Sequence, residues 1–259
     1  MRLPTLLIAL LLSCLTAHAQ RVVSLLPSAT YSAAQMGADA NIVGRTSYCP
    51  KAEDGVKTTI IGDAMTVSTE AIVALRPDVV IASPFTSAAV VDKLKSLGLK
   101  VTVLATPKDF DGVCQQFIQV GQLTGHEAEA KQIVAEERTA VAAIVAKAKN
   151  LKGKKFYFQI GVNPLWGATP DYYIADMANL LGGLNILKVG EGACSREVVL
   201  ARRPDVIVVS SLGGLGSGEV NVWGKLTRAR VVVVDENTLC CPTPIFFRQS
   251  LESIADGCK

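Results

Sequence analysis

Residues 70–83 read EAIVALRPDVVIAS, and residues 197–210 read EVVLARRPDVIVVS. The two stretches are identical at seven of 14 positions, at an offset of 127 residues. Each copy predicts a short helix that starts at a glutamate and ends before the proline, because proline lacks a backbone N–H and restricts the preceding residue. The Val/Ile run that follows does not alternate with polar residues, which is typical of a strand covered on both faces in a parallel sheet. The chain therefore contains the same helix–turn–strand unit twice.

The similarity between the two halves extends beyond this unit. RVVSL at residues 21–25 opens the first half and KFYFQ at residues 155–159 opens the second, while residues 99–104 correspond to residues 229–234. Strands that alternate with helical stretches in each half indicate the α/β class. We expect two Rossmann-like lobes related by duplication, with a ligand cleft between them.

A long helix is expected between the two halves. Residues 126–149 contain neither glycine nor proline and are rich in alanine, glutamate and lysine. A helix of about 24 residues spans roughly 36 Å, and it is a rigid spacer, so hinge motion should be small. The expected organisation is a signal peptide at 1–19, an N-terminal α/β lobe at 20–125, a connecting backbone helix at 126–150 and a C-terminal α/β lobe at 151–259.

The first residues indicate export. Arg2 gives a positive start, residues 6–12 form an apolar run, and residues 17–19 (AHA) provide a small-residue cleavage site, as in a secretory signal peptide. The apolar run is far shorter than the ~20 residues of a membrane-spanning helix. We expect a soluble mature protein in the periplasm, and the alternative is lipid attachment at Cys14. A net charge of +3 without a basic stripe gives no electrostatic footprint for nucleic acid.

Four segments carry a resemblance to a known family. They are RVVSLLPSAT at 21–30, VGRTSYCP at 43–50, IGVNPLW at 160–166 and CSRE at 194–197. Their order and spacing resemble the periplasmic binding proteins for cobalamin, haem and ferric siderophores, most closely the cobalamin-binding members. The resemblance implies the solute-binding component of an ABC importer. Such a protein takes a corrinoid or a related metal chelate without any cofactor and, as a monomer, hands it to a dimeric permease.

The resemblance places the ligand between the lobes, where hydroxyl and helix N–H groups can face polar ligand atoms. Tyr48 and Trp166 offer flat apolar faces from opposite lobes, and the alternative is that each is a half-buried core residue. In this family one exposed glutamate on each lobe docks on the permease, and Glu70 and Glu197 occupy those positions. The alternative is that both only stabilise helix N-termini. The expected ligand-binding residues are Pro27, Ser28, Ala29, Thr30, Tyr48, Cys49, Trp166 and Cys194.

The chain departs from the cobalamin-binding members in its aromatic residues. Those relatives have further tryptophans near the positions of Ala64 and Glu191, whereas this chain has only Trp166 and Trp223. The usual aromatic clamp is therefore partly absent.

Cysteines gather instead near the expected cleft. Six remain after cleavage, and an even number in an oxidising compartment favours disulfides. The alternatives are ligation of a soft metal ion, which thiolates suit, and small loop residues without any bond. Metal ligation supports a second functional hypothesis, a cysteine-based periplasmic protein that binds and delivers a metal ion without a permease. The metal-ligand candidates are Cys49, Cys194, Cys240 and Cys241, while Cys114 and Cys258 lie outside the cleft segments.

No catalytic pattern stands out. His126 is the one histidine of the mature chain, and no Cys-His or His-Glu spacing surrounds it. The sequence lacks the Gly-X-Ser-X-Gly elbow, the phosphate-binding loop and the zinc-protease helix. The glycine-rich residues 213–218 follow a strand without the Rossmann spacing, and we expect a mobile loop there. The sequence therefore predicts a protein that is not an enzyme.

Overall fold

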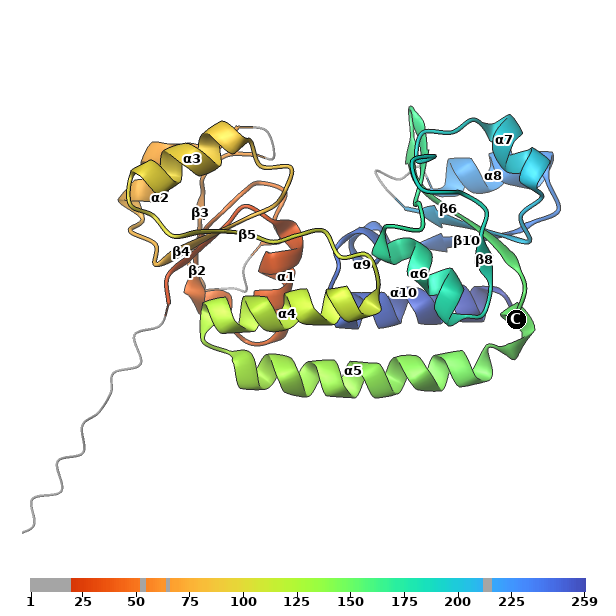
Figure 1. Cartoon of the computed structure of the whole chain (residues 1–259), viewed down its shortest axis with the longest axis horizontal. Coiled ribbons are helices and arrows are strands. Elements are labelled where there is room, and N and C mark those ends of the chain that lie inside the picture. Colours follow the sequence, from red (N-terminus) through yellow and green to blue (C-terminus); the bar gives the residue numbers. More distant parts are fainter. Residues whose placement is uncertain (1–19, 52–54, 64–65, 212–215) are drawn as a thin grey trace, which may run out of the picture.

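The computed structural model of the chain describes residues 20–51, 55–63, 66–211 and 216–259. Two α/β lobes stand side by side on a layer of helices (Figure 1). The expected signal peptide at residues 1–19 lies outside the described part. Among the described helices, none combines the length and the apolar character that crossing a membrane requires.

The first lobe is built on five parallel strands in the order β3-β2-β1-β4-β5. The strands are β1 (Val22–Ser24), β2 (Ile42–Arg45), β3 (Thr59–Ile60), β4 (Val79–Ala82) and β5 (Val101–Val103). The helices are α1 (Pro27–Gln35), α2 (Thr69–Ala74), α3 (Ala88–Ser96) and α4 (Phe110–Thr124), with a 3-10 turn at Asp39–Asn41. Successive strand residues point to opposite faces. Val22 and Ile81 pack with α1 and α4, while Val23 and Val80 pack with α2 and α3. This double burial explains why the strands are apolar without alternation.

The second lobe repeats this plan around the strand order β10-β9-β6-β7, with β8 also paired to β6. All of these pairings are parallel except that of β6 with β7. The strands are β6 (Lys155–Val162), β7 (Leu165–Gly167), β8 (Leu184–Asn185), β9 (Val206–Ser210) and β10 (Arg230–Val234). The helices are α6 (Tyr173–Leu180), α7 (Arg196–Arg202), α8 (Gly216–Leu226), α9 (Glu236–Cys240) and α10 (Pro244–Gly257). The strands β1, β4 and β5 therefore correspond to β6, β9 and β10, as the internal repeat requires.

The repeated Arg-Pro-Asp turn has the same geometry in both lobes. Arg76 and Arg203 both adopt left-handed backbone angles, with φ of 45° and 50°, a conformation that ends a helix and is uncommon outside glycine. The carboxylate of Asp78 accepts a 2.7 Å hydrogen bond from the backbone N–H of Arg21, and Asp205 accepts one of 2.8 Å from that of Lys155. The turn thus ties each helix end to the start of the central strand. The helix is stopped by the arginine conformation as well as by the proline.

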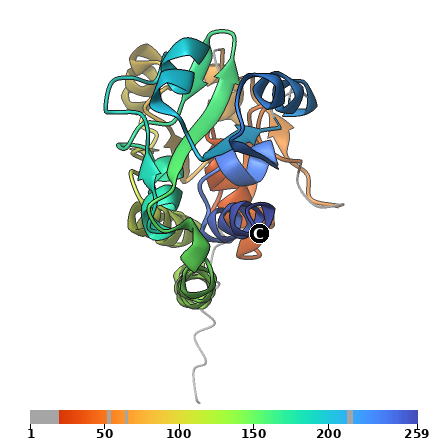
Figure 2. The ribbon, with the colours of Figure 1, turned by 90° about the vertical axis from the view of Figure 1, so that its right-hand side faces the viewer.

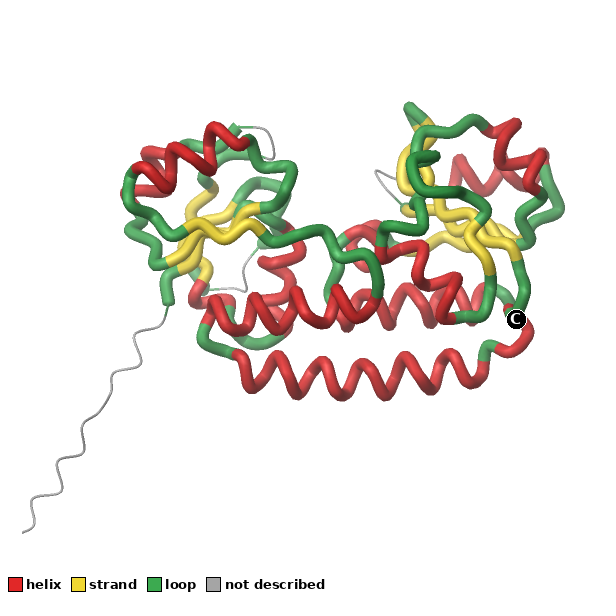
Figure 3. The backbone as a smooth tube through the Cα atoms, in the orientation of Figure 1, coloured by secondary structure: helices red, strands yellow, loops and turns green. Residues whose placement is uncertain are grey.

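The expected connecting helix is present as α5 (Glu127–Lys147), but it is not alone. Helix α4 lies beneath the first lobe and helix α10 beneath the second, side by side where they overlap, and both pack on α5 (Figures 2 and 3). Nε of Arg248 on α10 forms a 2.6 Å ion pair with Oε2 of Glu137 on α5. We call α4, α5 and α10 the helical base. The domain boundaries at residues 126 and 150 stay a prediction.

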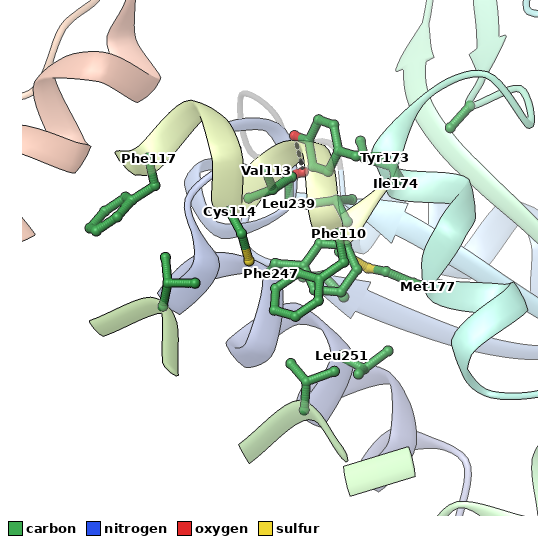
Figure 4. Packing of buried hydrophobic residues seen from close by; sticks show 14 of the residues in the cluster. Phe110, Val113, Cys114, Phe117, Tyr173, Ile174, Met177, Leu239, Phe247 and Leu251 are labelled. Carbon is green, nitrogen blue, oxygen red and sulfur yellow. Dashed lines mark hydrogen bonds between the residues drawn. The ribbon is translucent and has the colours of Figure 1, made fainter. Parts of the chain in front are cut away.

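A single apolar cluster runs through the helical base from one lobe to the other. In it Phe110 of α4 stacks on Phe247 of α10, with ring centroids 4.6 Å apart (Figure 4). The hydroxyl of Tyr173 donates a 2.7 Å hydrogen bond to the carbonyl oxygen of Leu239, which fixes α6 to the end of α9. This shared core limits relative movement of the lobes to small displacements.

Candidate ligand-binding site

A cavity of about 150 Å³ lies where the two lobes face each other above the helical base. Loops that follow β1, β4 and β5 form its first wall, because the carboxyl ends of parallel strands meet at one edge of a sheet. The start of α6 and the segment between α9 and α10 form the opposite wall. The lining residues are Leu26, Pro27, Ser28, Ser83, Pro84, Phe85, Leu104, Ala105, Thr106, Pro107, Gln116, Tyr172, Cys240, Cys241 and Pro242.

A wider hollow of about 380 Å³ adjoins this cavity and shares Phe85, Thr106 and Tyr172 with it. Trp166 of β7 lines the hollow and is 46% exposed, and Phe85 of the first lobe is 86% exposed. Exposed apolar side chains that lie together mark binding sites, and these two line the same hollow. The cavity and the hollow together form the cleft, which has one exposed aromatic residue on each lobe.

Of the four predicted wall residues of α1, two line the cavity and two do not. Pro27 and Ser28 line the cavity. Ala29 and Thr30 do not, since both side chains are buried behind it and the hydroxyl of Thr30 donates a 2.9 Å hydrogen bond to Oγ of Ser24. Only the first turn of α1 therefore faces the cleft.

Three other predicted residues lie outside the lining of the cleft. Tyr48 is 69% exposed in the turn after β2. Cys49 is buried within the first lobe, with its sulfur 3.3 Å from Oγ1 of Thr46. The sulfur of Cys194 lies 3.4 Å from the hydroxyl of Tyr157 in the second lobe. Phe85 takes the place that Tyr48 was expected to fill.

The most distinctive polar group of the cavity wall is the hydroxyl of Ser28. The residue is only 2% exposed, and its Oγ has no hydrogen-bond partner among the described residues. Ser28 lies in the first turn of α1, whose N-cap residue Leu26 offers no side-chain cap. Helix N-termini carry partial positive charge and free N–H groups. This end of α1 is therefore suited to a hydrogen-bond-accepting atom of a ligand.

Sequence reasoning missed Gln116, a buried residue of α4 that reaches the cavity from below. Its Nε2 donates a 2.8 Å hydrogen bond to the carbonyl oxygen of Ala105, which holds the side chain in place. The signal available was weak, because a glutamine among the apolar positions of an amphipathic helix is common.

The ionisable groups of the second wall stay protonated near neutral pH. Burial, followed by the neighbouring Cys240, raises the pKa of Tyr172 to about 12. Burial also raises the pKa of Cys240 to about 11 and, with the adjacent Cys240, that of Cys241 to about 12. This wall therefore presents neutral hydroxyl and thiol groups to a ligand.

The disulfide expectation is not borne out, because the six cysteines of the described chain are free. Cys114 is buried in the helical base, and Cys258 ends α10. The described residues also contain no group of three or more His, Cys, Asp or Glu side chains that could hold a metal ion. The described residues therefore offer no binding site that would support the hypothesis of a cysteine-based metal-ion carrier.

The position of Ala64 lies outside the described residues, and so do residues 213–215 of the glycine-rich loop, while residues 216–218 start α8. Glu191 is described, and the Arg202 guanidinium donates hydrogen bonds of 2.5 and 3.0 Å to its carboxylate. These bonds lower the pKa of Glu191 to about 2. Glu191 lines neither the cavity nor the hollow. The position where the cobalamin-binding relatives have a tryptophan therefore adds no aromatic residue to the cleft of this chain.

The two predicted docking residues occupy equivalent positions. Glu70 is the second residue of α2 and Glu197 the second of α7, and the N-cap residues Ser68 and Ser195 are also equivalent. Both carboxylates are exposed, and helices α2 and α7 lie on the side of the molecule away from the helical base (Figure 1). Hydrogen bonds from its own backbone N–H and from Thr69 lower the pKa of Glu70, and bonds from Ser195 and its own N–H lower that of Glu197. Both groups are therefore ionised at neutral pH.

Known proteins resemble this chain along most of its length. A vitamin B12-binding protein of Yersinia pseudotuberculosis is 29% identical over 215 residues, which cover 80% of this chain and 76% of that protein. The periplasmic vitamin B12 binding protein of Vibrio cholerae has the same fold, with a TM-score of 0.78 at 20% identity over 92% of this chain and 96% of that one. The periplasmic haem binding protein of the same organism gives a TM-score of 0.77 at 21% identity, over 92% and 98% of the two chains.

These similarities confirm the α/β class, the two lobes and the resemblance on which the sequence analysis relied. A sequence model described as "Periplasmic binding protein" matches residues 22–225, which is most of the chain. The chain therefore belongs to the family of periplasmic binding proteins.

Proposed function

We propose that this protein is the solute-binding component of an ABC importer and captures a corrinoid or a related metal chelate in the cleft. One observation carries the proposal: both lobes contribute walls to an apolar cavity that opens between exposed aromatic residues, Phe85 on one lobe and Trp166 on the other. Flat ring systems bind well between aromatic faces. The names of the relatives, which bind vitamin B12 or haem, supply the ligand class.

The size of the cavity bears on how such a ligand enters. Its volume of about 150 Å³ is below the ~300–1,000 Å³ typical of small-molecule sites. A large chelate therefore has to occupy the adjoining hollow as well and to separate the lobes slightly. The same movement would bring the buried hydroxyl of Ser28 within reach of a polar ligand atom. Gln116 offers a second polar group to the edge of the ring.

Docking on the permease is proposed to use Glu70 and Glu197, one exposed carboxylate on each lobe. A two-fold symmetric permease dimer would meet both lobes of a single binding protein, which itself has an internal repeat. Exposed ion pairs contribute only ~0–1 kcal/mol each. Docking therefore stays reversible, while complementary charges fix the orientation of the complex.

Export is proposed to follow from the leader at residues 1–19, with cleavage after Ala19, and lipid attachment at Cys14 is the alternative. The mature protein would comprise lobes at 20–125 and 151–259 around the connecting helix at 126–150. It would act as a monomer in the periplasm without a catalytic step.

The test is a fluorescence titration of the mature protein with aquocobalamin, dicyanocobinamide, haem and ferric siderophores. Haem and corrinoids absorb where tryptophan emits, so energy transfer to a bound chelate should quench both Trp166 and Trp223, and the loss of emission measures binding. Trp166→Phe removes one exposed aromatic residue of the cleft and should weaken the affinity for the chelate, while Trp223 still reports binding. Failure of every chelate to bind would refute the proposed ligand class. An unchanged affinity in Trp166→Phe would refute the assignment of the cleft.

A further inference from the structure

The lining of the cleft is unsuited to an anionic ligand. Among the described residues that line the cavity, none carries a charge at neutral pH. In the described lining of the hollow, Asp171 is the one ionised side chain, and it is exposed. Residues 52–54, 64–65 and 212–215, which the structure does not describe, include neither lysine nor arginine. The described lining of the cleft therefore carries one negative charge and no positive one.

Asp171 is held in its ionised form. The hydroxyl of Thr169 donates a 2.6 Å hydrogen bond to Oδ1 of Asp171. This bond and one from its own backbone N–H lower the pKa of Asp171, and the charge of Lys108 lowers it further. Lys108 belongs to the lining of a neighbouring hollow, where Asp109 also lies. A ligand in the cleft therefore meets the carboxylate of Asp171 itself, while Lys108 lies outside the lining of the cleft.

The polar groups at the start of α1 match a single neutral oxygen atom. Pro27 has no N–H, and the N–H of Ala29 already donates a 3.1 Å hydrogen bond to the carbonyl oxygen of Leu26. Among the described residues, the hydroxyl and the N–H of Ser28 therefore remain as the donors at this end of the helix. Two donors satisfy a carbonyl oxygen, which has two lone pairs, but a carboxylate has about four acceptor positions.

The N-terminus of α1 does not by itself make this an anion site. The partial positive charge of a helix N-terminus favours an anion. A carboxylate that enters the cavity, however, would lose its water without meeting a cation, and this loss costs more than one helix terminus returns. A neutral amide avoids the cost, and its carbonyl oxygen can still accept from Ser28.

The size of the cavity fits a side arm of a ring and not the ring itself. A water molecule occupies roughly 30 Å³ of the liquid, so a cavity of about 150 Å³ has room for several groups of that size. Corrinoid rings carry acetamide and propionamide arms around their edge, whereas haem carries two carboxylate arms. An amide arm can therefore enter the cavity while the ring occupies the adjoining hollow.

We propose that the cleft selects uncharged, amide-bearing ring chelates over carboxylated ones, with one amide arm beside Ser28 in the cavity and with Asp171 repelling ligand carboxylates in the hollow. This inference rests on the proposed function and narrows its ligand class. Asp171 is thereby a residue that determines specificity.

The experiment compares three corrinoids that differ in the ends of their side arms. Dicyanocobinamide carries amides, dicyanocobyrinic acid carries carboxylates, and the heptamethyl ester of that acid keeps each carbonyl oxygen but removes the charge. Binding to the mature protein is measured by calorimetry. The variants are Asp171→Asn and Asp92→Asn. The second is the matched control, because Asp92 is an exposed carboxylate on α3 outside the lining of the cleft.

The wild type should bind dicyanocobinamide and the methyl ester with affinities within about tenfold of each other. The acid should bind at least about 100-fold more weakly, because its carboxylates find no cation in the cleft. Asp171→Asn should strengthen binding of the acid about two- to fivefold and so narrow the gap. Asp92→Asn should leave the gap unchanged.

The possible contrary results separate the inference from the proposed function. If the acid binds the wild type as tightly as dicyanocobinamide, or if haem binds and no corrinoid does, charge selection is refuted and the proposed function stands. If Asp171→Asn leaves the gap unchanged, or Asp92→Asn narrows it equally, the role of Asp171 is refuted. If none of these corrinoids, nor aquocobalamin, haem or a ferric siderophore, binds the wild type, the proposed ligand class fails and the inference fails with it.

Discussion

Replacing Ser28 by alanine should have opposite effects on stability and on ligand binding. The hydroxyl of Ser28 is buried at the cavity wall, and the part of the chain that the structure describes gives it no hydrogen-bond partner. A buried hydroxyl without a hydrogen bond costs about 1–3 kcal/mol, and alanine also has a slightly better helix propensity. We therefore expect Ser28→Ala to raise the free energy of unfolding of the ligand-free protein by about 1 kcal/mol.

The same helix provides a matched control one turn further on. Ser32 is equally buried, at 2% exposed, but its hydroxyl donates a 2.8 Å hydrogen bond to the carbonyl oxygen of Ser28. Losing a satisfied neutral hydrogen bond costs about 0.5–1.5 kcal/mol. Ser32→Ala should therefore lower the free energy of unfolding, so the two variants should move in opposite directions.

Urea denaturation without ligand measures the first effect, and titration with aquocobalamin or haem measures the second. If a ligand atom accepts the Ser28 hydroxyl hydrogen, Ser28→Ala should weaken binding about fivefold, which corresponds to roughly 1 kcal/mol. Ser32→Ala should leave the affinity unchanged. The reasoning is refuted if Ser28→Ala destabilises the ligand-free protein as much as Ser32→Ala does, or if it binds ligand as tightly as the wild type.

Three further predictions concern docking, the helical base and pH. Reversing both charges, with Glu70→Lys and Glu197→Lys, should abolish uptake in cells while the affinity for ligand in solution stays the same; normal transport would contradict the docking role. Phe247→Ala, which removes a buried ring from the helical base, should lower the free energy of unfolding by about 3–5 kcal/mol in urea, and a loss below about 1 kcal/mol would show that the two lobes do not share a core. The folded-state pKa of Glu191, about 2, lies below its ordinary value of 4.5, so the stability that its pairing with Arg202 provides is present above pH 4.5 and is lost as the pH falls toward 2. In urea denaturations at a series of pH values, Glu191→Gln should reduce the fall of the unfolding midpoint below pH 4.5. An unchanged fall would show that other carboxylates cause it.

Patterns within short stretches of the sequence were enough to predict the fold. The repeated Arg-Pro-Asp unit identified the duplication, and the uninterrupted Val/Ile runs identified strands buried on both faces. The repeat also placed Glu70 and Glu197 at equivalent, exposed helix starts. These features depend on the backbone chemistry of a few neighbouring residues, so they are legible without knowing which elements meet in space.

The lining of the cleft was predicted only in part. Pro27, Ser28 and Trp166 do lie there, because they follow or belong to strands whose ends a parallel sheet brings to one edge. Tyr48 is absent from the lining of both the cavity and the hollow, and Phe85 from another loop lines both. Which aromatic side chain enters a cleft depends on loop conformation, and single-residue patterns do not encode it.

The sequence by itself determined the duplicated α/β lobes, the helix between them and the exposed glutamate at the start of one helix in each lobe. Only the tertiary structure decided that α10 joins α4 and α5 in one base, that the cysteines remain unpaired, and that Cys241 lines the cavity. The physical reason is that periodicity and turn chemistry act over a few residues. A cavity, by contrast, is what remains after segments far apart in the chain have packed, and its lining follows from their mutual fit.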